Sequence, residues 1–173
     1  MPSKNASSAD NQQERLKTIG WVVGFVDGEG CFTVGIFKNP RAQRRLLWQV
    51  FPEFVVSQGE KSLGTLTYLQ EYFQCGSIIK NKRKDNHHED MYKYCVRALD
   101  GLDDKIIPFF VENNLKSAKH KDFLIFKKVI GMMRNKDHLK QKGLVKIAKL
   151  ALKMNRKKRS PMFLEILRGH TSN

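Results

Sequence analysis

Cysteine, proline and long apolar runs are all scarce in this chain of 173 residues. Its three cysteines, Cys31, Cys75 and Cys95, are an odd number without C-x-x-C spacing, which argues against a disulfide framework and against a zinc site. No apolar run approaches the roughly 20 residues that a membrane span needs. The N-terminus also lacks the charged-then-apolar layout of a secretory signal. We therefore expect a soluble, intracellular protein that is neither secreted nor membrane-bound.

Acidic residues are also in short supply, and the imbalance is concentrated at one end. The chain has 32 Lys+Arg against 17 Asp+Glu, a formal net charge of +15. Residues 115–173 hold 17 basic and 3 acidic side chains, whereas residues 1–114 are nearly neutral. This asymmetry favours a polyanion partner, and nucleic acid above membrane, because the basic residues are spread among aliphatic ones. We expect residues 116–159 to hold phosphates; a solvated tail is the simpler alternative.

The composition, 40% hydrophobic and 10% aromatic, is that of a globular protein, and the length suits one core. We expect a single domain over residues 11–154, between a disordered leader at 1–10 and a basic extension at 155–173. The cluster His87, His88, Glu89 and Asp90 resembles a metal site. Neighbours in sequence cannot easily all face one ion, so a polar turn is the better interpretation.

Hydrophobic periodicity predicts alternating helices and strand pairs. The expected elements are a helix from about Ala9 to Val26, strands over 31–38 and 46–57, a helix over 62–73, strands over 77–82 and 91–97, and helices over 100–113, 119–134 and 137–154. Pro52 favours an edge position or a bulge in the second strand. The order αββαββα predicts an α+β fold, a four-stranded antiparallel sheet with helices on one face.

The other face of this sheet is expected to stay open as a saddle-shaped surface. Polar and aromatic side chains on such a surface fit the major groove of a duplex, where base edges distinguish all four pairs. Alternatively, they face only solvent. The residues expected on this face, in the adjoining loops or at the start of the basic third are Thr33, Phe37, Asn39, Arg41, Arg44, Arg45, Gln49, Glu53, Val55, Lys80, Lys82, Lys93, Arg97, Lys116 and Lys121.

Three glycines mark one face of the first helix. Gly20, Gly24 and Gly28 are four residues apart, and each costs about 1 kcal/mol relative to alanine inside a helix. This cost is offset where the missing side chains let another backbone approach closely. The sequence contains only one helix with a glycine face of this kind. We therefore expect a homodimer in which this helix meets its own copy, with Gly20, Val23, Gly24 and Asp27 at the interface.

Two acidic residues fall at the carboxyl end of the same helix. The negative end of the helix macrodipole disfavours the carboxylates of Asp27 and Glu29 at this position, and a bound cation would make the interaction favourable. Oxygen ligands from a carboxylate and a backbone carbonyl suit a hard divalent ion such as Mg²⁺. Two copies meeting at a dyad would set two such sites side by side, an arrangement suited to cutting both strands of a duplex.

The segment Val22-Val-Gly-Phe-Val-Asp-Gly-Glu-Gly30 resembles the LAGLIDADG motif of homing endonucleases, with Gly24, Asp27 and Gly30 identical. The single copy, the strand pattern and the length are similar to the homodimeric, one-motif branch, and the resemblance extends from about Ile19 to Ile130. It implies that the motif helices form the dimer interface. It also implies that Glu29, in place of the commoner Asp, binds Mg²⁺ or Mn²⁺ with the Gly28 carbonyl.

The resemblance further implies that Gln58 and Lys119 lie near the attacking water. Neither an organic cofactor nor a covalent nucleophile is then needed. The expected substrate is a long pseudo-palindromic double-stranded DNA target cut on both strands. Members of this family are inhabitants of organellar introns, so a mitochondrion or chloroplast is the expected compartment.

Two alternatives to the nuclease remain open within the same fold. Proteins resembling this family also act as RNA maturases that assist intron splicing, and some keep only the DNA-binding surface. A binding-only descendant has no need of Glu29, so the presence of this residue favours nuclease activity.

Overall fold

The computed structural model describes residues 4–39, 47–81, 90–154 and 166. Its helices and strands follow the predicted order. They are α1 (Lys4–Glu29), β1 (Gly30–Lys38), β2 (Trp48–Gly59), α2 (Leu63–Phe73), β3 (Ser77–Asn81), β4 (Met91–Val96), α3 (Leu99–Gly101), α4 (Ile107–Glu112), α5 (Lys119–Arg134) and α6 (Gln141–Ala151). The α+β class is therefore confirmed.

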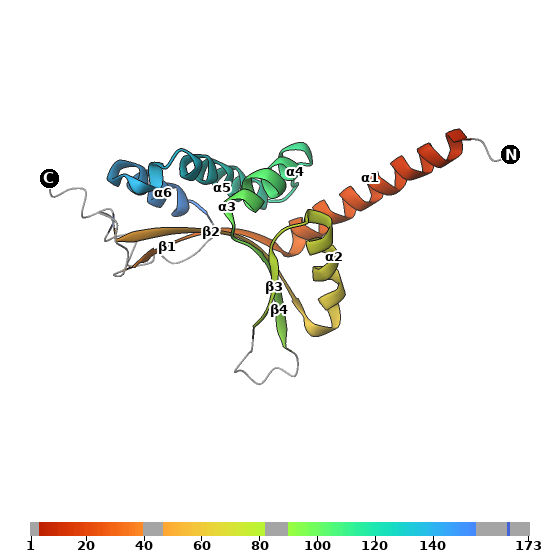
Figure 1. Ribbon diagram of the computed structural model, residues 1–173, viewed down its shortest axis with the longest axis horizontal. Coiled ribbons are helices and arrows are strands. Elements are labelled where there is room, and N and C mark those ends of the chain that lie inside the picture. Colours follow the sequence, from red (N-terminus) through yellow and green to blue (C-terminus); the bar gives the residue numbers. More distant parts are fainter. Residues whose placement is uncertain (1–3, 40–46, 82–89, 155–165, 167–173) are drawn as a thin grey trace.

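The four strands form one antiparallel sheet in the order β1-β2-β4-β3. Pairing of β2 with β4 begins only at Phe54, so Pro52 lies where β2 has a partner on its β1 side alone. Pro52 therefore occupies a local edge of β2, as predicted, although β2 is an inner strand of the sheet. In Figure 1, β3 and β4 turn away from the direction of β1 and β2, which gives the sheet a saddle-like curve.

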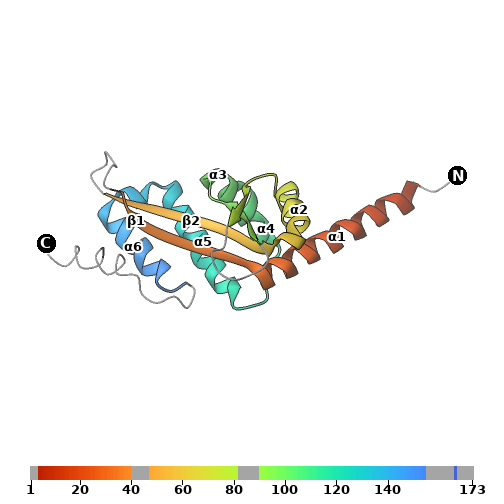
Figure 2. The same ribbon diagram turned by 90° about the horizontal axis from the view of Figure 1, so that it is seen from below.

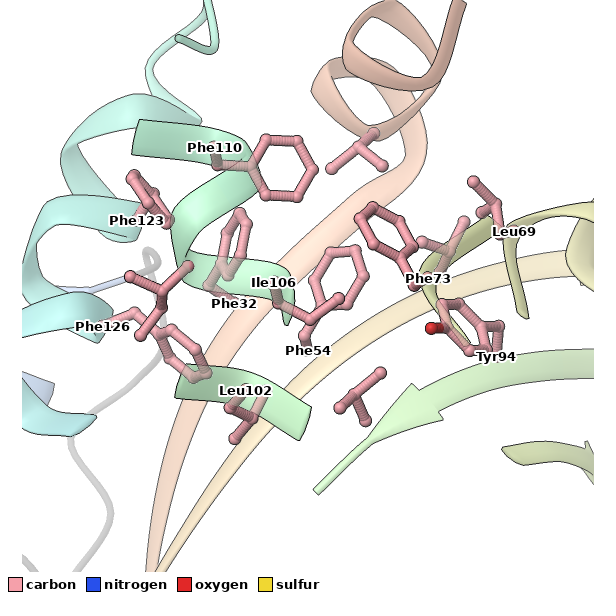
Figure 3. Close-up of a cluster of buried hydrophobic side chains, with 14 of the residues drawn as sticks. Phe32, Phe54, Leu69, Phe73, Tyr94, Leu102, Ile106, Phe110, Phe123 and Phe126 are labelled. Carbon is pink, nitrogen blue, oxygen red and sulfur yellow. The ribbon is translucent and has the colours of Figure 1, made fainter. Parts of the chain in front are cut away.

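Alternation along the strands decides which face of the sheet is covered. Phe32, Phe54 and Tyr94 are fully buried and pack, with Phe110 and Phe123 from the helices, in an aromatic core (Figure 3). Helices α3, α4, α5 and α6 cover this one face, and the other face is left open (Figures 1 and 2). Burial of large aromatic side chains on a single face therefore fixes the layer order.

Helix α1 starts earlier than predicted. The expectation of a disordered leader over residues 1–10 is wrong from Lys4 onward, because α1 begins there and runs to Glu29. The stretch from Lys4 to Ile19 contains neither glycine nor proline and is rich in Ala, Gln and charged residues, so a helix nucleated in the apolar segment can propagate backward. The first half of α1 projects away from the rest of the molecule (Figures 1 and 2).

The predicted helix over 100–113 is present as three consecutive helical segments that together span residues 99–112. A π-helical turn, Leu102–Ile106, separates α3 from α4, and Pro108 lies in the first turn of α4. Proline lacks the N–H that would continue an α-helical ladder, so it is tolerated at a helix start and not in its middle. The predicted 137–154 helix likewise begins with a separate 3-10 turn, Asp137–Leu139, before α6.

Candidate active site

A lysine from α5 lies at the carboxyl end of α1. The Lys119 Nζ donates hydrogen bonds to the carbonyl oxygens of Val26 at 2.9 Å, Asp27 at 2.8 Å and Gly28 at 3.0 Å. Carbonyls in the last turn of a helix lack intrahelical partners and carry the negative end of the macrodipole. Burial lowers the pKa of the Lys119 ammonium, although the nearby Asp27 and Glu29 carboxylates oppose that shift.

Asp27 ties the start of α5 to the end of α1. Its carboxylate accepts hydrogen bonds from the backbone N–H of Lys116 at 2.8 Å, the backbone N–H of Ser117 at 2.9 Å and the Ser117 Oγ at 2.6 Å. Burial acts to raise the pKa of Asp27, but these hydrogen bonds outweigh it and hold the pKa below its usual value. Asp27, expected at the dimer interface, therefore binds within the chain and positions Lys119.

Replacing Asp27 with alanine is expected to lower the free energy of unfolding by about 2 kcal/mol, because charge-assisted hydrogen bonds to two backbone N–H groups and one hydroxyl are lost. Urea unfolding of both proteins at a fixed protein concentration measures the change in the free energy of unfolding. Asp10→Ala, at an exposed carboxylate in the first half of α1, is the matched control and should change stability by less than about 0.5 kcal/mol. Equal effects of the two changes would contradict the anchoring role.

Glu29 is the last residue of α1 and its side chain is exposed. Within the part of the chain that the structure describes, no hydrogen bond or ion pair holds its carboxylate. No cluster of three or more His, Cys, Asp or Glu side chains forms among these residues either. Glu29 follows Gly28 directly in the chain, and a carboxylate with a backbone carbonyl is a ligand pair that suits a hard divalent cation, which keeps waters and takes further oxygen ligands from phosphate.

Gln58 lies at the same end of the sheet, on the neighbouring strand. Gly30 at the start of β1 pairs with Val56 of β2, and Gln58 follows two residues later, half-buried. The structure thus brings Glu29 and Lys119 together and sets Gln58 beside the start of β1. In the described residues no hydrogen bond joins Gln58 to Glu29 or to Lys119.

Most residues expected on the open sheet face lie there. Because Phe32, Phe54 and Tyr94 point into the core, their neighbours point the other way. The expected residues at these alternate strand positions are Thr33, Phe37, Gln49, Glu53, Val55 and Lys93. Arg97 follows the end of β4, and Asn39 follows the end of β1. Four of the expected residues lie outside the described residues: Arg41, Arg44, Arg45 and Lys82. The same holds for His87, His88 and Glu89 of the expected polar turn.

Lys80 is on the wrong face for the prediction made from sequence. In the β3–β4 register Lys80 pairs with Tyr92, whereas Lys93 pairs with Ile79, so the two lysines project from opposite faces. The Lys80 ammonium lies 5.6 Å from the centroid of the Tyr92 ring. Strand alternation alone could not fix this register, since it depends on the length of the turn between the strands.

The described part of the basic third lies behind the sheet. Helices α5 and α6 cover the face of the sheet opposite the open one (Figures 1 and 2). The phosphate-binding surface expected over 116–159 therefore stays a prediction, and its residues 155–159 lie outside the described residues. Lys116 and Lys121 are exposed at the start of α5, beside the carboxyl end of α1.

The glycine face of α1 is uncovered. A Cβ built on Gly20, Gly24 or Gly28 would meet nothing within 4 Å, and all three residues are exposed. Val23 next to them is half-buried. The apolar second half of α1 therefore presents its flattest side to solvent, the side expected to receive a second backbone.

The contact between Asp27 and Ser117 could not be predicted from the sequence. Ser117 stands two residues before a predicted helix, which is a capping signal in itself. Its partner lies 90 residues away in sequence, however, and no local pattern connects them.

The chain matches the family model described as LAGLIDADG endonuclease over residues 22–130. It is 31% identical over 136 residues to the probable intron-encoded endonuclease 2 of Neurospora crassa, which covers 78% of this chain and 28% of that protein. An uncharacterized 50.9 kDa protein in ND4 intron 1 of Podospora anserina is 34% identical over 121 residues, 69% of this chain and 25% of that one. The chain thus spans about a quarter of the length of these curated relatives.

Solved structures give the same assignment. The homing endonuclease I-TnaI superposes with a TM-score of 0.77 at 35% identity, over 87% of this chain and 96% of that one. I-SmaMI, a LAGLIDADG homing endonuclease bound to cleaved DNA, superposes with a TM-score of 0.77 at 34% identity, over 86% of this chain and 47% of that one. Together with the motif at the end of α1, these matches show that the chain belongs to the LAGLIDADG endonuclease family.

Proposed function

We propose that this protein is a site-specific DNA endonuclease that hydrolyses both strands of a long pseudo-palindromic duplex in the presence of Mg²⁺ or Mn²⁺. The observation that carries the proposal is the free Glu29 carboxylate next to the Lys119 ammonium at the carboxyl end of α1. Two neighbours support it: I-SmaMI has been seen bound to cleaved DNA and bound to its uncleaved target with calcium ions.

In this proposal Glu29 and the Gly28 carbonyl hold the divalent ion. When bound, such an ion lowers the pKa of a water molecule and offsets charge on a phosphate. Lys119 keeps a positive charge beside the scissile phosphate, and Asp27 holds the lysine in place through Lys116 and Ser117. Gln58 orients the attacking water from the neighbouring strand. No histidine base or covalent nucleophile is required.

The open sheet face is the surface proposed to bind the duplex. Its curvature and its polar and aromatic side chains suit insertion into the major groove, where side chains can reach base edges. Lys116, Lys121 and Lys93 would contact phosphates, which makes affinity fall with salt. Glu29 and Lys119 lie at the end of the same sheet, so a duplex seated on it brings its backbone to them.

Cleavage of both strands requires two such sites, and we propose that a second copy of this chain supplies the other one. The support is the uncovered glycine face of α1 and the coverage of I-TnaI, of which this chain matches 96%. A second, similar half within one longer chain would meet the same need, and I-SmaMI is about twice the matched length. The molecular mass of the native protein in solution distinguishes a homodimer from a single longer chain.

The compartment is part of the same proposal. Relatives of this chain are named as intron-encoded endonucleases, and one is a protein in an ND4 intron. We propose that this chain likewise derives from an organellar intron, in a mitochondrion or chloroplast. None of the described helices is long and apolar enough to cross a membrane.

The direct test is to incubate the purified protein with a randomised duplex library and Mg²⁺, and to sequence the cut ends. We expect one recurring pseudo-palindromic target and no cutting in EDTA. Binding of one target without cutting would favour a DNA-binding descendant, and binding of structured intron RNA alone would favour a maturase; either result would overturn the nuclease proposal.

Lys119→Met is expected to lower the single-turnover cleavage rate by roughly a hundredfold, because a half-buried positive charge near the reacting phosphate is removed. DNA affinity should change far less, since one charge among many phosphate contacts is lost. Lys127→Met, at an exposed lysine of the same helix behind the sheet, is the matched control and should cut at the wild-type rate. Similar rates for both variants would remove Lys119 from the mechanism.

A further inference from the structure

Three side chains on the open face form a small preassembled unit. The Arg97 Nε donates a hydrogen bond to the Glu53 carboxylate, and the Arg97 guanidinium carbon lies 5.4 Å from the centroid of the Phe51 ring. Phe51 and Glu53 are alternate residues of β2, and Arg97 follows the last residue of β4, the strand next to it. The three side chains therefore share one position on the face proposed to meet DNA.

An ion pair at this place needs a reason other than stability. The Arg97 side chain is 45% exposed and that of Glu53 is 19% exposed, and pairs this accessible contribute only about 0–1 kcal/mol. Glu53 is also the one carboxylate that the described strands project from the open face, where bare negative charge would repel a duplex. Arg97 neutralises that charge, and Glu53 in turn limits the orientations of Arg97.

The orientation leaves a specific set of donors. Glu53 engages Nε, so the two terminal nitrogens of the guanidinium keep their N–H groups, and no described residue takes them in a hydrogen bond. Two adjacent N–H donors in one plane match the O6 and N7 acceptors of guanine in the major groove. Stacking on Phe51 and the bond to Glu53 fix the side chain before binding, which lowers the entropy lost on contact.

We propose that Arg97 is a specificity-determining residue that reads one guanine in each half of the target, with Glu53 and Phe51 as its positioning residues. The inference rests on the proposed function, because it names a base that the same surface recognises. A phosphate contact is the competing role for an exposed arginine. The guanidinium fork, fixed by Glu53 and Phe51 of the inner strand β2, favours a base edge, since guanine is read by two coplanar donors.

The test is selection of duplexes from a randomised library by the full-length wild type, Arg97→Gln, Glu53→Ala and Glu53→Gln, scored by base preference at each position. We expect the wild type to select guanine at one symmetric pair of positions. Arg97→Gln should lose that preference roughly tenfold at those positions and at no others. Glu53→Ala should weaken the same preference, and Glu53→Gln, which keeps an acceptor for Nε, should retain most of it.

Two further arms make the outcome decisive. Lys128→Gln, an exposed cation on α5 behind the sheet, should leave the whole profile unchanged. Replacing the assigned guanine with 7-deazaguanine, which lacks the N7 acceptor, should weaken binding by wild type but not by Arg97→Gln. A uniform loss of affinity by Arg97→Gln on all sequences, with the base profile intact, would show a phosphate contact and overturn the proposal. Failure of the wild type to select any sequence would instead refute the proposed function.

Discussion

Glu29→Gln is expected to abolish metal-dependent DNA cleavage while leaving DNA affinity nearly unchanged. Glutamine is close to glutamate in size but carries no charge, so it keeps the helix end and loses the anionic ligand for a divalent ion. The bound ion is worth several kcal/mol of transition-state stabilisation, which corresponds to a rate loss of more than about a thousandfold. The loss should be larger than that of Lys119→Met, since the lysine only assists.

The measurement pairs two assays on the same variant. Single-turnover cleavage of the selected target in Mg²⁺ reports the chemical step, and fluorescence anisotropy in Ca²⁺ reports binding. Glu112→Gln is the matched control because Glu112 is likewise an exposed glutamate at the last residue of a helix, here α4. The control should cut like wild type. Wild-type cleavage by Glu29→Gln would exclude Glu29 as the metal ligand.

Local pattern is sufficient to predict the fold and to propose Glu29 as a site residue. The two-residue alternation around Phe32 and Phe54 and the helical spacing of leucines in α2 placed the elements to within a few residues. The burial of those aromatic residues in one core then confirmed the layer order. Glu29 can be proposed from the sequence because the motif lies within one continuous segment, where spacing along the chain reports spacing along the helix.

Long-range contacts were out of reach. The hydrogen bonds that Asp27 accepts from Lys116 and Ser117 join segments about 90 residues apart. No pattern within either segment indicates that it contacts the other. The face on which Lys80 lies is mispredicted for a related reason: it is set by the β3–β4 register and not by the residues of its own segment. The packing of α5 and α6 behind the sheet likewise does not follow from the charge of these segments, because net charge carries no information on fold.

Gly24→Leu is expected to prevent the proposed association of two copies of the chain and, with it, the proposed cutting of both strands. Within one chain the new side chain meets open space, and leucine favours a helix over glycine by roughly 0.8 kcal/mol, so folding itself should not suffer. At a two-fold interface each substitution occurs twice, and overpacking costs about 1–3 kcal/mol per site. Association should therefore weaken by at least about thirtyfold and by up to roughly ten-thousand-fold.

Sedimentation velocity over a range of concentrations measures the association, and circular dichroism checks that the variant is folded. Gly131→Leu is the matched control: Gly131 is an exposed glycine of α5 whose built Cβ also meets nothing within 4 Å. Both variants gain the same side chain in the same kind of helical position, so a difference between them isolates what happens at the glycine face of α1. A dimer that survives Gly24→Leu would place the interface elsewhere, and a wild type that is monomeric at all concentrations would show that the second site comes from a longer chain.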